Sequence, residues 1–181
     1  MHCKNVIILC LCIVVALSAC TTTQTGQTSY DHEAGTTIVT GRQTTIAPLA
    51  GAVRTIFLKA EMASGDTELY LVVLYLSTKG WLSADQVWDA SGEKLRGFMG
   101  QNETIPIQYG QVTKEIYYIP LTRRYLEKHR KSGIEVRLKG PNGTLLATQP
   151  PTFISGFLAD VDAVKAKPTG EVIVKKLAQA H

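Results

Sequence analysis

A long apolar run in the middle of the chain limits its fold more than any other feature. Residues 69–76 read Leu-Tyr-Leu-Val-Val-Leu-Tyr-Leu and are apolar on both faces. The length of this run and the turn-forming residues on either side favour a central β-strand over a helix. Residues 53–60, rich in β-branched and apolar side chains, predict a second strand, which the segment 61–66 separates from the first. The chain is therefore expected to be built around a sheet.

Two turn sequences predict tight hairpins elsewhere. Asp89-Ala90-Ser91-Gly92 lies between the segments 86–88 and 94–96, and Pro141-Asn142-Gly143 lies between 134–139 and 144–148. Asn-Gly supplies the positive φ angles that tight hairpins need. Apolar and charged residues alternate through 134–139, which places one face of that strand on a core and the other in water. Residues 116–119 predict a further strand, which we expect to end at Pro120.

Two helices are predicted among these strands. Thr122 can cap a helix that runs to about residue 131 and ends at Gly133, with Leu121 and Leu126 at the positions of a hydrophobic staple. Thr152 can cap a second helix, whose apolar residues recur at helical spacing: Phe153, Phe157, Leu158, Val161 and Val164. Together these elements predict a mainly β fold, a β-sandwich (immunoglobulin-like or similar) with a short crossover helix and a C-terminal helix. An α+β arrangement is the alternative.

The N-terminus has the three parts of an export signal in the expected order. A short cationic start with Lys4 leads into the apolar run 6–17, and small residues follow at 18 and 19. As a helix, that run would be about 18 Å long, well short of the ~30 Å hydrocarbon core of a bilayer. We therefore expect a cleavable signal peptide over residues 1–19 rather than a permanent transmembrane anchor.

The segment Leu17-Ser18-Ala19-Cys20 directly follows the apolar run and resembles the lipobox of bacterial lipoproteins at every position. The resemblance implies cleavage between Ala19 and Cys20, a diacylglycerol on the Cys20 sulfur and acylation of the new amino terminus. Several acyl chains would make this attachment stable, since one chain alone holds a protein only marginally. Thr21 stands where an Asp often retains such lipoproteins in the inner membrane, so the resemblance implies the outer membrane, facing the periplasm. Two further segments, 120–129 and 154–159, are similar to uncharacterised proteobacterial lipoproteins, from which no site residues follow.

Residues 21–37 are rich in Thr, Gln, Ser and Gly and have almost no large apolar side chains. Such a composition predicts a flexible tether, because it buries too little surface to offset the entropy lost on ordering. We expect one β-sandwich domain over 38–166, behind the lipidated cysteine and tether of 20–37. Residues 165–170 indicate a hinge, and 167–181 a C-terminal tail, in which 171–175 form an edge strand or stay loose.

The cysteines and the charge exclude several classes of protein. All four cysteines, Cys3, Cys10, Cys12 and Cys20, lie at or before the predicted lipid site. The mature domain is therefore expected to have neither a disulfide nor a cysteine metal site. The formal charge is +4, and +3 once Lys4 is removed with the signal peptide. This charge is too small to indicate nucleic-acid binding, although it is compatible with weak attraction to anionic lipid or a cell-wall polymer.

Residues of the kind that form catalytic sites are sparse. Of the four histidines only His129 lies within the predicted domain, so we expect no metal site, no nucleophilic triad and no cofactor. Asp85 and Asp89 bracket Trp88, and Glu93 lies across the turn, a set that a glycoside hydrolase could use. Acids beside a Ser-Gly turn usually accept hydrogen bonds from backbone amides instead, and we favour that role. Trp81 and Trp88 would form a recognition patch if exposed, but we favour core packing for both.

A basic helix is the one feature that breaks a local rule. Arg123 and Arg124 lie in the first turn of the predicted helix, where the helix dipole disfavours cations. Lys128, Arg130 and Lys131 extend the same basic surface. Such an exception can mark a functional surface, and the hypothesis is contact with lipid phosphates, peptidoglycan carboxylates or an acidic partner protein. The simpler interpretation is a solvated helix face.

The sequence thus predicts an envelope lipoprotein that acts as a non-enzymatic binding or assembly module. Its partners would be the membrane, through the lipid on Cys20, and an envelope protein or peptidoglycan. One alternative is an accessory subunit of an envelope secretion or pilus machine, which a large exposed apolar patch would favour. The other is a cell-wall or glycan hydrolase, which a pocket holding Asp85, Asp89 or Glu93 with raised pKa values would favour.

Overall fold

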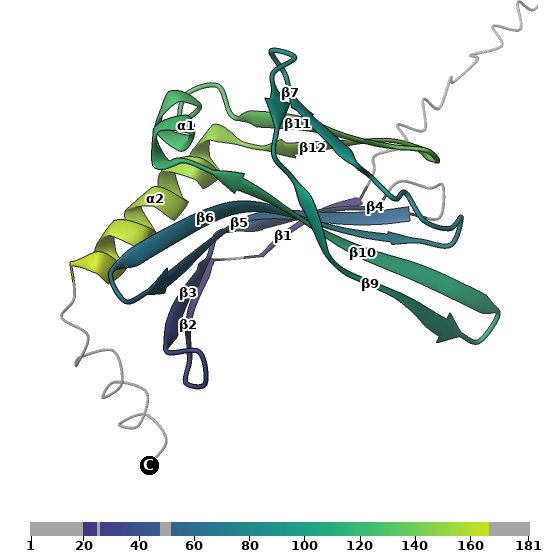
Figure 1. The fold of residues 1–181 in the computed structure, drawn as a ribbon, viewed down its shortest axis with the longest axis horizontal. Helices are drawn as coiled ribbons and strands as arrows, with labels where there is room; N and C mark the ends of the chain where they lie inside the picture. The colour runs from purple at the N-terminus through teal and green to yellow at the C-terminus, as the bar shows by residue number, and fades with distance from the viewer. Residues whose placement is uncertain (1–19, 25, 48–51, 167–181) are drawn as a thin grey trace, which may run out of the picture.

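Two antiparallel sheets and two helices make up the fold in the computed structural model, which describes residues 20–24, 26–47 and 52–166 (Figure 1). The larger sheet has eight strands, six of them in the order β1 (Cys20–Gln24), β4 (Gln43–Ala47), β5 (Ala52–Ala63), β6 (Asp66–Ser77), β10 (Gly110–Leu121) and β9 (Phe98–Ile107). The other two, β2 (Gln27–Asp31) and β3 (Thr36–Thr40), form a hairpin that joins β5 through β3. The smaller sheet has four strands in the order β12 (Gly143–Gln149), β11 (Ile134–Gly140), β7 (Gln86–Asp89) and β8 (Lys94–Leu95). The predicted β-sandwich is confirmed.

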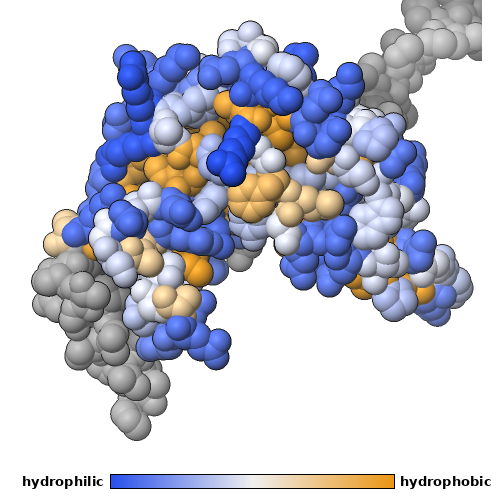
Figure 2. Space-filling view, in the orientation of Figure 1, coloured by the Kyte–Doolittle hydropathy of each residue, from blue (hydrophilic) through white to orange (hydrophobic). Residues whose placement is uncertain are grey.

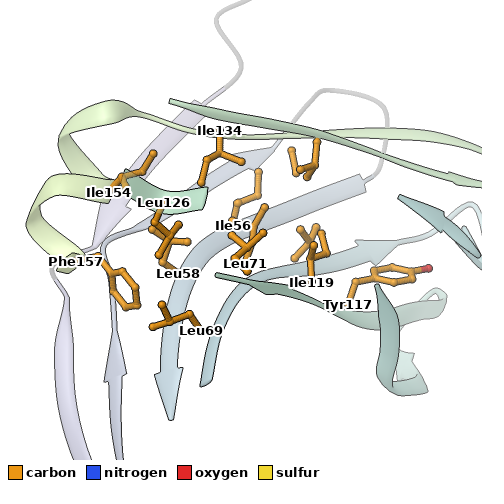
Figure 3. Close-up of a cluster of buried hydrophobic side chains, with 14 of the residues drawn as sticks. Ile56, Leu58, Leu69, Leu71, Tyr117, Ile119, Leu126, Ile134, Ile154 and Phe157 are labelled. Atoms are coloured by element: carbon orange, nitrogen blue, oxygen red, sulfur yellow. The ribbon is translucent and has the colours of Figure 1, made fainter. Parts of the chain in front are cut away.

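The core lies between the two sheets and beneath the helices. Every second residue of β5 and β6 points into it, as the buried residues Ile56, Leu58, Leu71 and Val73 show. The smaller sheet contributes Val136 and Leu138 of β11 in the same alternating pattern, which is what the sequence of residues 134–139 predicts. Figure 3 shows these layers of side chains meeting, with side chains of both helices closing one end.

The predicted turns and the central strand are confirmed. β6 lies between β5 and β10, and the two hairpins form at the Asp89-Ala90-Ser91-Gly92 and Pro141-Asn142 turns. The predicted end of the strand at Pro120 is wrong, because β10 continues to Leu121. β9 pairs with β10 only as far as Tyr118, so Pro120 has a neighbouring strand on one side only, a position where the missing N–H is tolerated.

The two helices form where they were predicted, with different ends. α1 (Arg123–Lys128) begins at the predicted cap, where the Thr122 side chain accepts a hydrogen bond from the Tyr125 backbone N–H at 3.1 Å. It ends earlier than residue 131, since the following turn is tightened by the Arg130 N–H donating to the Glu127 carbonyl. α2 (Pro151–Lys165) begins before Thr152, which is therefore not its cap. Pro151 occupies the first turn, where a missing N–H costs nothing.

The predicted flexible tether differs from the structure. Residues 20–24 pair with β4 as strand β1, and 27–31 pair with β3 as strand β2, so the predicted domain boundary at residue 38 falls inside β3. Low apolar content was the basis of the tether prediction. These strands are held by backbone pairing to an existing sheet, and their many threonines favour the extended conformation. Apolar burial was therefore the wrong criterion for this segment.

The predicted signal peptide, residues 1–19, and the predicted C-terminal tail, 167–181, lie outside the described residues. Within the part of the chain that is described, no helix has the length and apolar character needed to cross a membrane.

A buried carboxylate ties the connection between the two sheets in place. Glu115 of β10 is fully buried, and its oxygens accept hydrogen bonds from the Leu82 and Ser83 backbone N–H groups at 2.6 and 2.7 Å. The Tyr117 hydroxyl donates to the same carboxylate at 2.6 Å and accepts from the Ala84 N–H at 2.9 Å. The segment that leaves β6 for β7 is thus held against the large sheet by one polar network.

Candidate interaction surface

The large sheet has a second apolar face, opposite to the core. Side chains of a strand alternate between the two sides of a sheet, and on β5, β6 and β10 the residues between the core positions are mostly apolar as well. We call this surface the outer face. Its apolar residues are Val53, Phe57, Val72, Leu74, Leu76, Ile116 and Tyr118. All of them except the buried Val72 are half-buried.

The strand register places the apolar residues of the outer face next to one another in rows. Phe57 and Tyr118 flank Val72 on either side, and Thr55 and Ile116 flank Leu74 in the next row. The small sheet and both helices lie on the core side of the large sheet in Figure 1. No element of the described chain covers the outer face with a further layer, so this apolar surface is open.

Three aromatic rings stand at one edge of the outer face. Phe98 and Tyr118 are stacked with ring centroids 5.6 Å apart, and Tyr70 meets Tyr118 edge-on at 5.8 Å. The stack depends on Gly100, which lies at an irregularity in the pairing of β9 with β10. A Cβ at Gly100 would come within 2.4 Å of the Tyr118 ring, so only glycine lets the ring lie over the backbone.

Both lysines of the outer face are paired with carboxylates of neighbouring residues. Lys59 forms an ion pair with Glu61, and the Lys114 Nζ lies 2.7 Å from Glu103 Oε1. The Tyr70 hydroxyl donates a hydrogen bond to Glu68, and this bond, together with partial burial, raises the pKa of Tyr70 to about 12. The outer face therefore presents two ion pairs and the Glu68 carboxylate around an apolar centre.

A two-stranded arm extends beyond one end of the outer face. β10 pairs with β6 only from Thr113 onward, so the distal parts of β9 and β10 form a hairpin without a third strand (Figure 1). The arm carries the exposed residues Ile105 and Ile107, and Tyr109 at its tip is 88% exposed. In Figure 2 the outline of the molecule is hollowed between this arm and the β2–β3 hairpin.

A separate hollow of about 530 Å³ lies where α1 and the end of α2 meet β6. Leu69, Leu121 and Val161 are among the apolar residues that line it, and Arg96 and Lys165 are among the cations. A third cation of this hollow, Arg123, belongs to the predicted basic surface.

The five residues of the predicted basic surface differ in their contacts. Arg123 reaches across to α2, where its guanidinium donates two hydrogen bonds to the Asp162 carboxylate at 2.6 and 2.9 Å, and its Nε donates to Glu127 at 2.8 Å. These bonds raise the pKa of Arg123 further and hold the pKa of Asp162 below its ordinary value. The cation that breaks the helix-dipole rule is thus part of the contact between the helices.

Of the other predicted basic residues, one contacts α2 and three are exposed. The Arg130 Nε donates to the Ser155 hydroxyl of α2 at 3.2 Å. Arg124, Lys128 and Lys131 are exposed to solvent. Two of the five predicted binding residues therefore have structural contacts with α2.

Asp89, one of the carboxylates near Trp88, has a structural role in the hairpin turn. Asp89 is buried and accepts hydrogen bonds from the Ser91 hydroxyl and from the Ser91 and Glu93 backbone N–H groups. Burial alone would raise its pKa, but these hydrogen bonds and the nearby His129 lower it overall. Asp85 is exposed and precedes the other end of β7. Four steps along an extended chain place their Cα atoms up to about 13 Å apart.

His129 packs against Tyr125 with ring centroids 4.4 Å apart. Its Nε2 and the Tyr125 hydroxyl are buried and have no hydrogen-bond partner among the described residues. Burial, with the negative charges of Asp89 and Glu93, raises the pKa of Tyr125 to about 12. In the described ranges, no three His, Cys, Asp or Glu side chains are grouped so that they could hold a metal ion.

The two tryptophans are half-buried at the small sheet, and neither is part of the buried core. The favoured core packing is therefore wrong for both. Trp81 accepts a hydrogen bond from the Asn142 side chain through its carbonyl at 2.9 Å, and Lys94 lies over the Trp88 ring. Both are held by local contacts near the hairpin turns.

The structure describes the predicted lipid site only in part. Ala19 lies outside the described residues, and Cys20 is described only as the first residue of β1, paired with Ala47. The outer face was not predicted as a site, although the sequence carried one signal, since residues 69–76 are apolar on both faces.

No family model, no curated protein and no solved structure matches this chain.

Proposed function

We propose that this chain is a lipid-anchored, non-enzymatic module of a bacterial cell envelope that associates with protein through the outer face of its large sheet. The observation that carries the proposal is the uncovered apolar surface formed by the half-buried residues Phe57, Leu74 and Ile116. Soluble monomers rarely leave a large contiguous apolar surface exposed, and such a surface commonly marks a protein or membrane interface. Lys59 and Lys114 already have carboxylate partners on their own chain, which favours an apolar protein surface over the carboxylates of peptidoglycan.

The lipid anchor rests on Leu17-Ser18-Ala19-Cys20. With the lipid on Cys20, at the beginning of β1, the domain would lie close to the membrane surface, because no tether would separate the strand from the anchor. The resemblance to the lipobox, with Thr21 after Cys20, supports an outer-membrane location facing the periplasm. Cys20→Ser should leave the precursor uncleaved and without lipid by mass spectrometry, whereas Cys12→Ser should be processed normally. Equal processing of both variants would contradict the anchor.

The assembly role favours the accessory-subunit alternative over the hydrolase alternative. A general acid needs a raised pKa, whereas the pKa of Asp89 is lowered and its oxygens hold a turn. This arrangement argues against Asp89 as the acid of a hydrolase.

The assembly role can be tested by the size of the native particle. Leu74→Gln on the outer face is compared with Leu146→Gln, a matched change at an exposed leucine of β12. Solubilised envelopes should contain the wild type and Leu146→Gln in a particle larger than the single chain, and Leu74→Gln as the single chain. Migration of the wild type as a single chain would refute the proposal.

A further inference from the structure

The outer face can be matched to one particular partner by its charge, its size and its shape. This step rests on the proposed function and names the protein that the outer face binds. The half-buried central residues Phe57, Leu74 and Ile116 are apolar, and an apolar partner surface is needed to remove their exposed parts from water.

The ion pairs of the outer face favour a partner whose charges are also paired. Lys59 and Lys114 are already paired with Glu61 and Glu103 on their own chain. Like charges that face each other across an interface repel and exclude wrong partners. Two identical outer faces avoid this repulsion, because each brings its lysines with their counter-charges in place.

The area of the outer face fits an interface between two copies. A strand of 12 residues, the length of β5, β6 and β10, is ~40 Å long at about 3.3 Å a residue. Four strands, from β5 to β9, span about 19 Å at ~4.8 Å a strand. The product, a flat outline of about 760 Å² a copy that includes the arm, is of the same order as the ~800 Å² of accessible surface that each partner buries in a standard protein interface.

The shape of the sheet indicates how two copies would meet. A twisted sheet is saddle-shaped, and a saddle fits a copy of itself that is turned by about 90°, which is the orthogonal mode of sheet packing. The hollow under the sheet in Figure 2 leaves room for such a crossing. In this arrangement the β9–β10 arm of each copy, with Ile105 and Ile107, lies beside the other copy.

We propose that the outer face binds a second copy of this chain, with the two large sheets crossed face to face about a two-fold axis. Leu74 and Ile116 lie near the axis, so each contacts the same region of the other copy, as in any interface between identical patches. The aromatic edge with Phe98 and Tyr118 lies at the rim. The assembly is a dimer of lipid-anchored domains that shares one buried apolar layer.

The test is a photo-crosslinking amino acid placed in the full chain in its own cells. Leu74→p-benzoylphenylalanine probes the outer face, Thr55→p-benzoylphenylalanine repeats the probe at the adjacent residue of β5, and Leu146→p-benzoylphenylalanine is the control on β12. Circular dichroism and the urea midpoint of each purified variant show that it folds. The expected product is an adduct of twice the chain mass at 74 and 55, several-fold above its yield at 146, that contains only this chain.

Each other outcome separates the two proposals. An adduct with a different protein at 74 and 55 would overturn the second copy as the partner and would support the assembly role. Yields at 74 and 55 no higher than at 146 would overturn both. Adding Ile116→Gln to the probe at Thr55 should reduce the self-adduct several-fold, and an unchanged yield would place the contact between copies elsewhere.

Discussion

Replacing Glu115 by Gln should destabilise the domain more than any other single-atom change in a charged side chain of the large sheet. The two carboxylate oxygens of Glu115 accept three hydrogen bonds, from the Leu82 and Ser83 backbone N–H groups and from the Tyr117 hydroxyl. A glutamine at this position has one accepting oxygen. In the best orientation of the side chain, that oxygen keeps the hydrogen bonds from the Ser83 N–H and the Tyr117 hydroxyl. The NH₂ group of the glutamine then faces the Leu82 N–H, so that two donors oppose each other.

The cost can be worked from this geometry. Hydrogen bonds to a charged acceptor contribute about 1.5–3 kcal/mol, and a buried donor left without a partner costs about 1–3 kcal/mol. One such loss, with weakening of the two bonds that remain, gives a decrease of about 2–4 kcal/mol in the free energy of unfolding. The measurement is urea unfolding of the purified protein, in which the midpoint should fall while the slope with denaturant stays constant.

A matched control isolates the burial of the carboxylate. Glu103→Gln makes the same chemical change on the same sheet, where the side chain is 41% exposed and forms one ion pair with Lys114. Surface ion pairs contribute about 0–1 kcal/mol, so this variant should unfold close to the wild type. Equal, small effects for both variants would refute the argument that the Glu115 network holds the connection between the sheets.

Three further changes test local features. Thr122→Ala should lower stability by about 1 kcal/mol, because the cap of α1 is lost, while Thr122→Ser should not; urea midpoints compare them. Gly156→Ala should raise stability by up to about 1 kcal/mol, since Gly156 lies inside α2 and a Cβ there meets no atom within 4 Å; a lower melting temperature would contradict this. Asp89 has a lowered pKa in the folded state, so its contribution is present above the ordinary value of 3.8 and is lost as pH falls below it. Asp89→Asn should therefore flatten the loss of stability in acid, and an unchanged acid unfolding curve would show that Asp89 does not contribute.

Local signals in the sequence predicted most of the strands and turns. The Asp89–Gly92 and Asn142-Gly143 turns and the cap at Thr122 each depend on residues close together in the chain, and all three are where the sequence indicated. The β1 and β2 strands were missed because their stability comes from pairing with β4 and β3 rather than from their own apolar content.

The candidate surface could be predicted only in part, because it is assembled from distant segments. The apolar character of residues 69–76 on both faces indicated that both sides of β6 need cover. Only the fold shows that Phe57 and Tyr118 lie on either side of Val72. The basic helix was interpreted as a surface because Asp162, the partner of Arg123, comes from α2 far along the chain. Contacts between residues far apart in the chain decide whether a basic side chain is free or paired, and local residue patterns do not show these contacts.

The central claim is that the outer face is covered in the cell, and thiol labelling at that face measures it directly. Leu74→Cys and the control Leu146→Cys are labelled with a small maleimide in intact envelopes and again as dilute purified protein. The account predicts that Cys at position 74 reacts several-fold more slowly in the envelope than in the purified protein, while position 146 reacts at similar rates in both. Similar rates at position 74 in the two states would contradict it.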